Sequence, residues 1–168
     1  MLLTREQIEL AFGRLNSELA RAGERAEIYL VGGAVMCLVH QARPSTKDVD
    51  AWFSNPQAVR AAALRIASEL SLPDDWLNDA AKGFIPEGAG VDAWRSFSHL
   101  EVSHADAPTL LAMKCAAARS EEDARDIRFL ADHLGLTTVE AILGVVLRFY
   151  PAERLPVRTQ LLIEEMFG

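Results

Sequence analysis

The pattern of hydrophobic and polar positions divides the chain into an alternating first part and a helical second part. Apolar residues recur at three- and four-residue steps after Thr4, whose spacing to Gln7 is that of a capping box, and Gly23 ends this first helix. A short apolar strand is predicted over 28–31, where two glycines stop it, and a second strand is predicted over 49–53. This alternation predicts a sheet with helices packed on it.

The segments around these strands extend the same pattern. Residues 34–41 are apolar and favour a helix, and Asn55 followed by Pro56 marks the start of another, with the asparagine as cap and the proline as first helical residue. Prolines and glycines punctuate 71–98, so this stretch is predicted to be irregular. A third strand is predicted over 100–103.

From Asp106 onward the sequence predicts helices only. The expected helices are 108–119, 121–134, 138–149 and 156–166. The third of these opens with a capping box formed by Thr137 and Glu140. We therefore expect a single α+β domain over the whole chain: a small mixed sheet with helices on one side in 1–104, and an all-helical part in 105–168.

Composition and charge narrow the possible functions. The chain has 168 residues, half of them hydrophobic, which suffices for a core without disulfides or structural metals. Its 17 Lys and Arg against 24 Asp and Glu give a net charge of −7, so any contact with nucleic acid should be local. Cys37 and Cys115 lie in apolar helical patterns and indicate buried thiols. With no signal peptide and no apolar run long enough to span a bilayer, we expect a cytoplasmic protein without membrane association.

The candidate chemistry lies between residues 28 and 53. A strand runs into Gly32 and Gly33, a helix follows, and the next strand carries Asp48 and Asp50. Strand side chains alternate, so both carboxylates point to one face, where they can hold a pair of divalent cations. Carboxylate oxygens suit Mg²⁺. Glycines let the backbone approach a triphosphate closely, and the N–H groups at the following helix start face the anion.

This arrangement resembles the nucleotidyltransferase superfamily of the polymerase-β-type fold, whose signature is a hydrophobic residue, Gly-Gly or Gly-Ser, a short helix and Asp-x-Asp. The segment RPSTKDVD at 43–50 is similar to the Arg-x-x-Thr-Lys-Asp-hydrophobic-Asp of the AbiEii-like branch, which includes toxins of toxin–antitoxin and phage-defence systems. Residues 72–84, 110–130 and 148–158 resemble a subgroup of uncharacterised bacterial nucleotidyltransferase-like proteins. The resemblance implies that the glycine pair approaches the phosphates and that the two aspartates bind the metal.

Several residues outside that signature are candidates for binding the nucleotide or its phosphates. The resemblance matches Lys114 with a lysine that opens the helix after the last strand, and Asp126 with an aspartate on the next helix. Both are expected to bind nucleotide, and an ordinary ion pair between helices is the alternative. Lys47 and Arg43 flank the Asp-x-Asp strand and are expected to receive phosphate. Asn78, in the 72–84 stretch, is expected to cap a short helix rather than contact a ligand.

A third acidic residue is the part of the site that the sequence leaves open. Active members of the superfamily generally place one on a neighbouring strand, where it completes the metal site and deprotonates the incoming hydroxyl. Glu101, in the third predicted strand, is the first candidate, and Asp92 in the irregular stretch is the second. Without a third acid the protein would bind nucleotide and metal but transfer inefficiently.

Two classes of function follow. The first is an enzyme that depends on Mg²⁺ or Mn²⁺ and moves a nucleotidyl group from a nucleoside triphosphate to an acceptor hydroxyl. By resemblance, the acceptor is a tRNA 3′ end or a protein side chain, and the setting is a toxin with a cognate antitoxin. The alternative is a catalytically weak or inactive module that binds nucleotide or a partner protein. The pattern does not decide the oligomeric state.

Overall fold

The computed structural model describes every residue of the chain except 119 and 120. Arg119, the last residue of the predicted helix 108–119, therefore lies outside the described residues. The chain divides into two compact units, which we call the sheet unit (1–83 with 91–104) and the helical unit (84–90 with 105–168). The mixture of helices and a small mixed sheet confirms the predicted α+β class. In the part of the chain that the structure describes, no helix combines the length and apolar character that a membrane crossing needs.

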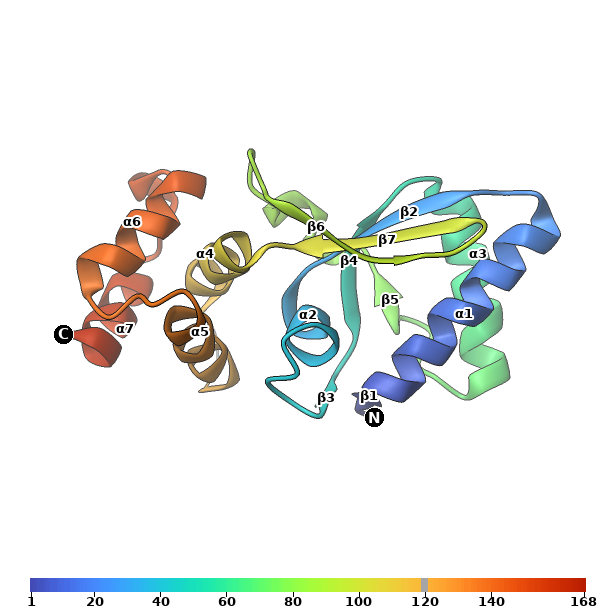
Figure 1. Cartoon of the computed structure of the whole chain (residues 1–168), viewed down its shortest axis with the longest axis horizontal. Coiled ribbons are helices and arrows are strands. Elements are labelled where there is room, and N and C mark those ends of the chain that lie inside the picture. The colour runs from blue at the N-terminus through green and yellow to red at the C-terminus, as the bar shows by residue number, and fades with distance from the viewer. Residues whose placement is uncertain (119–120) are drawn as a thin grey trace. The chain divides into compact units, whose positions relative to one another are not determined.

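The sheet unit is built on five strands in the order β5-β4-β2-β7-β6 (Figure 1). The central strand β2 pairs antiparallel with β4 and parallel with β7, and β4 is parallel to β5. The register places Leu30 of β2 opposite Ala51 on one side and His104 on the other. The strands are β2 (Ala26–Leu30), β4 (Val49–Phe53), β5 (Leu77–Asn78), β6 (Val91–Ser96) and β7 (Leu100–Ala105), with β1 (Leu3–Thr4) and β3 (Ser45–Thr46) as a separate antiparallel pair.

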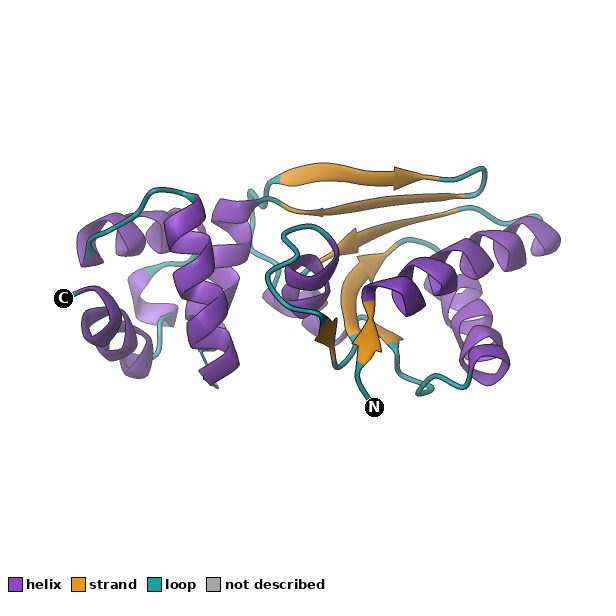
Figure 2. Cartoon of the chain, turned by 60° about the horizontal axis from the view of Figure 1, so that its bottom comes forward, coloured by secondary structure: helices purple, strands orange, loops and turns teal. Residues whose placement is uncertain are grey.

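Three α-helices complete the sheet unit. They are α1 (Arg5–Ala22), α2 (Gly32–Leu38) and α3 (Pro56–Leu70), and a short 3₁₀ helix, η1 (Ala80–Phe84), follows β5. The predicted capping box is confirmed, since Thr4 and Gln7 bond each other's backbone N–H, and Gly23 ends α1 in the left-handed region. Figure 2 shows α1 and α3 side by side on one side of the sheet.

The core of the sheet unit lies between the sheet and these helices. Alternate strand residues are buried on one face of the sheet, among them Ile28, Leu30, Ala51, Phe53 and Val102. The helices contribute the other half of this core with Phe12, Leu15, Val59 and Ile66. Of the residues between those strand positions, Asp50, Trp52 and Glu101 are partly or largely exposed on the opposite face, whereas Tyr29 is buried. The face of the sheet opposite the core is therefore the one on which candidate functional side chains such as Asp50 lie.

The helical unit contains four α-helices. They are α4 (Ala107–Ala117), α5 (Glu121–His133), α6 (Val139–Phe149) and α7 (Val157–Phe167), with the 3₁₀ helix η2 (Ala152–Arg154) before the last. The α4 helix packs against the other three and is the most buried of the four. Asp106 caps α4 by accepting a hydrogen bond from the Thr109 N–H at 3.0 Å. The four predicted helices are confirmed, apart from shifts at their ends.

Three local predictions are wrong, each for a physical reason. The β5 and β6 strands lie in the stretch predicted to be irregular: β5 has only two residues, and β6 is an exposed edge strand without apolar alternation. Asn55 precedes α3 but does not cap it, because its side chain donates to Glu24 instead, at 2.9 Å. The cap of α6 is Thr138, not Thr137: Thr138 Oγ1 accepts from the Ala141 N–H at 3.2 Å.

Trp76 connects the sheet unit's layers and gives the first testable prediction. Its side chain is fully buried, its indole N–H donates to the Ala63 carbonyl at 3.0 Å, and its ring packs edge-on against Phe12. Trp76→Phe should lower the free energy of unfolding by about 1–3 kcal/mol, through a cavity and a lost hydrogen bond. Urea denaturation measures this, with Trp52→Phe as control: Trp52 is 43% exposed. Equal losses in both variants would contradict the packing described here.

Candidate functional site

Two aspartates and an asparagine meet where β4 begins. Asp50 lies on β4 directly beside Asn78 of β5, and in parallel strands such neighbours point to the same face. Asp48 comes just before β4, and its Oδ2 accepts a hydrogen bond from the Asn78 amide at 3.4 Å. The Asn78 Oδ1 meanwhile accepts from the Ala80 N–H at 3.1 Å, which turns the chain into η1. Asn78 therefore fixes the turn before η1 and also contacts Asp48; a capping role for it stays a prediction.

The glycine pair adjoins this group through the antiparallel pairing of β2 and β4. The Val31 N–H donates to the Asp50 carbonyl at 3.0 Å, so the end of β2 meets the start of β4. Gly32 then has a positive φ of 66°, which favours glycine. A Cβ on Gly32 would lie 3.3 Å from Oδ2 of Asp50. The Asp50 carboxylate is thus held directly against the turn of the backbone.

Gly33 faces different side chains from those near Gly32. A Cβ there would lie 2.3 Å from Nη2 of Arg43 and 2.7 Å from Oγ1 of Thr46, so the glycine leaves room for both groups. Thr46 is buried, and its hydroxyl donates to the Asp48 carbonyl at 3.2 Å. The turn therefore has a carboxylate beside one glycine and a guanidinium beside the other. Lys47, predicted to receive phosphate, is exposed in the same segment.

The electrostatics of Asp48 are those of a partly desolvated carboxylate. Burial raises the pKa of Asp48 above its ordinary value and outweighs the positive charge of Lys47, which lowers this pKa. The charge of Asp75 raises the pKa further, and the hydrogen bond from Asn78 lowers it. A cation beside Asp48 would relieve the unfavourable desolvation of its charged form.

The donor set fits a hard divalent cation shared with a phosphate ligand. Asp48 and Asp50 offer carboxylate oxygens on one face, which Mg²⁺ and Mn²⁺ prefer. Among the described residues, no group of three or more His, Cys, Asp or Glu side chains is arranged to hold a metal ion. The remaining coordination positions would have to be filled by water and by oxygens of the ligand, as is usual for Mg²⁺ bound with a nucleotide.

The two candidates for a third carboxylate do not lie beside this pair. Glu101 of β7 lies opposite Glu27 of β2, and the Glu27 carbonyl accepts a hydrogen bond from the Ser54 N–H just after β4. Glu101 is therefore level with Ser54, four residues along the chain from Asp50. At 3.3 Å per residue this is a distance of about 13 Å. Glu101 is exposed and accepts a hydrogen bond from Ser96. Asp92 lies on β6, three strands from β4 and about 14 Å away at 4.8 Å per strand. A catalytic role for either stays a prediction without support from this geometry.

Lys114 and Asp126 belong to the helical unit and form an ion pair between helices, which was the alternative interpretation, although the pair is buried and not on a solvated face. The Lys114 ammonium lies 2.9 Å from Oδ1 of Asp123 and 2.8 Å from Oδ2 of Asp126, and all three side chains are buried. The cluster ties α4 to α5. Removing the lysine would leave two carboxylates buried without their cation, which is strongly destabilising. A nucleotide contact by Lys114 or Asp126 stays a prediction.

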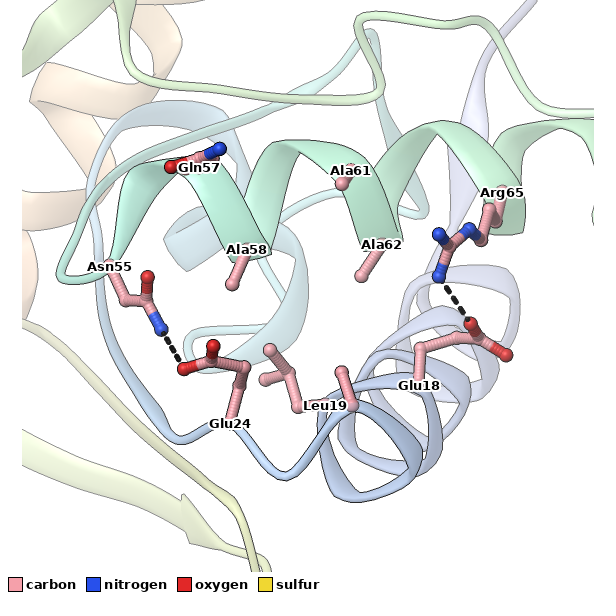
Figure 3. A pocket seen from close by; sticks show the side chains of 10 residues that line it. Glu18, Leu19, Glu24, Asn55, Gln57, Ala58, Ala61, Ala62 and Arg65 are labelled. Atoms are coloured by element: carbon pink, nitrogen blue, oxygen red, sulfur yellow. Dashed lines mark hydrogen bonds and ion pairs between the residues drawn. The ribbon is translucent and has the colours of Figure 1, made fainter.

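A separate hollow of about 290 Å³ lies between α1 and α3 (Figure 3). Its polar groups pair with one another: Asn55 donates to Glu24 at 2.9 Å, and Arg65 lies 3.3 Å from Oε2 of Glu18. Asn55 follows β4, so this part of the hollow is at the strand's far end from Asp50. The paired side chains indicate a structural role. The lining residues are Glu18, Leu19, Ala22, Glu24, Asn55, Gln57, Ala58, Ala61, Ala62 and Arg65.

Sequence reasoning missed how Asn78 and Thr46 contribute to the site. Asn78 lies on a strand of only two residues, for which no periodic pattern can exist, and the apolar Trp76 and Leu77 before it were the available signal. Thr46 was part of the segment that carried the resemblance, but its hydrogen bond to Asp48 depends on the turn between β3 and β4. Both residues hold Asp48 in place rather than adding charge.

Comparison with known proteins adds no further constraint. The chain matches no protein-family model, no curated protein and no solved structure. The assignment of a function therefore rests on the residues and geometry described above.

Gly33 gives a prediction about the turn. Gly33→Ala should lower the free energy of unfolding by about 1 kcal/mol, because the added methyl group displaces Arg43 and presses on Thr46. The control is Gly13→Ala in α1, where nothing lies within 4 Å of the added carbon. That substitution should instead stabilise the protein by about 0.5–1 kcal/mol through helix propensity. Thermal unfolding of both variants measures the difference, and a stabilised Gly33→Ala protein would contradict the close approach.

Asp48 gives a prediction with a defined pH dependence. Its folded pKa is raised, so between the unfolded and folded pKa values the folded state binds more protons, and stability falls as pH rises through that window. Asp48→Asn removes this penalty and keeps an acceptor for Asn78. The free energy of unfolding at neutral pH should rise by about 0.5 kcal/mol, allowing for solvent screening, and the gain should vanish below pH 4.

The matched control for this substitution is Asp79→Asn. A hydrogen bond from Lys82 lowers the pKa of Asp79, and the charge of Arg60 acts in the same direction. Removing that charge should leave stability unchanged or slightly lower, the opposite sign to Asp48→Asn. Denaturation curves at several pH values measure both variants. A destabilised Asp48→Asn protein at neutral pH would show that the Asp48 charge is stabilising in the free protein.

Proposed function

We propose that this protein is a metal-dependent nucleotidyltransferase, which moves a nucleotidyl group from a nucleoside triphosphate to an acceptor hydroxyl. The observation that carries the proposal is the contact between the Asp50 carboxylate and the Gly32 backbone, beside Asp48. It brings metal-binding oxygens next to the Gly32–Gly33 turn of the backbone. The signature of glycine pair, short helix and Asp-x-Asp, in which this protein resembles the superfamily, supports the same reading.

Each residue of the site has a task in this reaction. Asp48 and Asp50 would hold Mg²⁺ or Mn²⁺, and a bound ion supplies charge neutralisation for the phosphate oxygens. By the resemblance, the triphosphate would approach the backbone at the Gly32–Gly33 turn, and the Arg43 guanidinium lies at the same turn. The acceptor oxygen forms a bond to the α-phosphorus, the bond from that phosphorus to the bridging oxygen of the β-phosphate breaks, pyrophosphate leaves, and the hydroxyl proton is released.

The acceptor and setting are proposed by resemblance to the AbiEii-like branch. They are a tRNA 3′ end or a protein side chain as acceptor, and a toxin with a cognate antitoxin in the cytoplasm as setting. Lys47, Lys114 and Asp126 remain proposed nucleotide contacts on the same ground.

A second candidate function has one specific observation in its favour. On β7, the residues that share the face of Glu101 toward the end of the strand are Ser103 and Ala105, and neither is acidic. A site with two carboxylates and no neighbouring acid fits a module that binds nucleotide and metal but has lost efficient transfer. The experiment below distinguishes these two candidates.

The test combines a transfer assay with a binding assay. Purified protein is incubated with each α-³²P nucleoside triphosphate, Mg²⁺, and total bacterial RNA and protein. Label should appear on one acceptor class, and Asp48→Asn or Asp50→Asn should reduce it by at least about 100-fold, because a ligand of the cation is lost. In parallel, Mg²⁺ with the triphosphate should raise the melting temperature of the wild-type protein but of neither variant.

Controls separate the possible outcomes. Asp79→Asn makes the same chemical change outside the site and should keep both signals. Glu101→Gln tests the remaining candidate for a third acid: loss of transfer with binding retained would give Glu101 a catalytic role. A melting shift without transfer in any reaction would favour the binding module. No shift and no transfer, with Asp50→Asn indistinguishable from the wild type, would overturn both candidates.

A further inference from the structure

The outer face of α6 in the helical unit combines a glycine, an exposed leucine and two opposite charges. Of its eleven residues only Ile142 and Val146 are buried, although most of the others are apolar too. Both are fully buried, and α6 packs against α4 and α7; the three helices are labelled in Figure 1. On a helix with 3.6 residues per turn, Gly144 lies diametrically opposite these two buried residues. Gly144 is therefore the centre of the exposed face.

The residues around Gly144 are arranged at equal sequence distances on either side of it. Glu140 lies four positions before Gly144 and Arg148 four positions after it, and all three are exposed along one ridge of the helix. Ala141 and Leu147 lie three positions to either side and occupy the neighbouring rows. Leu147 is 48% exposed, whereas Ala141 is small. We call these five residues the α6 face.

Within the part of the chain that the structure describes, the charges of the α6 face have no ionic partners. Glu140 has no hydrogen bond or ion pair with any described residue, and the contact that Arg148 makes is with the ring of Phe149, 5.4 Å from its guanidinium carbon. The space above Gly144 is open, with nothing within 4 Å of an added Cβ. A cation and an anion, with open space above the glycine between them, are thus available at one surface.

We infer that the α6 face binds the same face of a second copy of this protein, with the two helices antiparallel and crossing at Gly144. In that arrangement a residue placed n positions before Gly144 meets the residue n positions after it in the other copy. Glu140 then meets Arg148 of the second copy, and Arg148 meets its Glu140. Leu147 packs on the small Ala141 across the interface, and the glycines let the helices approach closely. Each charged residue of the α6 face thus meets the opposite charge of the second copy, and each apolar residue meets an apolar one.

This self-complementarity is what selects a second copy over an unrelated partner. A face that binds a different protein has no reason to carry complementary residues at equal distances before and after its central residue. On the α6 face, the opposite charges of Glu140 and Arg148 lie four positions before and after Gly144. The small Ala141 and the large Leu147 lie three positions before and after it. A two-fold axis through Gly144 satisfies all four at once.

The first test is the oligomeric state. Sedimentation equilibrium of the full chain from low to high micromolar concentration should show a monomer–dimer equilibrium. Gly144→Leu should weaken the dimer by at least about tenfold, because the larger side chain fills the crossing point. This variant should fold, since the site is open in the single chain and leucine favours a helix over glycine. Its melting temperature at low concentration checks that.

The second test uses charge exchange, which only a self-paired face can satisfy. Arg148→Glu and Glu140→Arg should each weaken the dimer, because each brings like charges together twice. The double variant should restore it. An equimolar mixture of the two single variants should form a heterodimer, in which both pairs are again opposite. Arg154→Glu, the same charge change at an exposed position outside the face, is the control and should have no effect.

Three results would overturn the inference. The wild-type protein could be a monomer at every concentration. It could be a dimer whose affinity neither Gly144→Leu nor Arg148→Glu changes, which would place the interface elsewhere. Finally, the two single variants could fail to pair with each other while each folds normally. None of these outcomes bears on the nucleotidyltransferase proposal, which rests on the sheet unit.

Discussion

The candidate site depends on the antiparallel pairing of β2 with β4. That pairing ends with the Val31 N–H bonded to the Asp50 carbonyl, so the chain leaves β2 at the point where β4 begins. Without it, the glycine pair and the two aspartates would be separate features of the sequence. With it, the Asp50 carboxylate lies against Gly32, and the segment between the strands folds back to bring Arg43 and Thr46 to Gly33. A slip of one residue would turn Asp50 into the apolar core.

The surrounding structure holds this arrangement at some cost in stability. Asp48 is partly desolvated, and its pKa is raised in the folded protein, although Asn78 and Lys47 act to lower it. Such unfavourable placement is common where a protein keeps groups ready for a ligand. The Lys114 cluster is different, because its buried lysine is matched by Asp123 and Asp126 inside the helical unit. The charges of that cluster are paired within the protein, whereas the charged form of Asp48 would be stabilised by the cation of the proposed function.

Much of the fold could be predicted from the sequence, and the exceptions share a cause. The strand 49–53 and the capping box of Thr4 and Gln7 were correct, because alternation and capping are local signals. The β6 strand was missed since an edge strand with exposed side chains has no such signal. Asn55 looked like a cap, but a tertiary hydrogen bond to Glu24 replaced the local one. For the site, spacing indicated that Asp48 and Asp50 share a face, whereas the contact of Asn78 with Asp48 required the sheet order.

The position of Glu101 shows what a sequence can and cannot say about a third carboxylate. Alternation correctly places it on the face opposite the core, the face that also carries Asp50. Distance along the strand depends on register, which is set by the pairing of β7 with β2, and that pairing puts Glu101 in the row of Glu27. In the proposed function, a metal bound by these two carboxylates would therefore take its remaining ligands from the nucleotide and from water. Such a site should bind metal weakly alone and tightly with a triphosphate, because each supplies the oxygens or the charge that the other lacks.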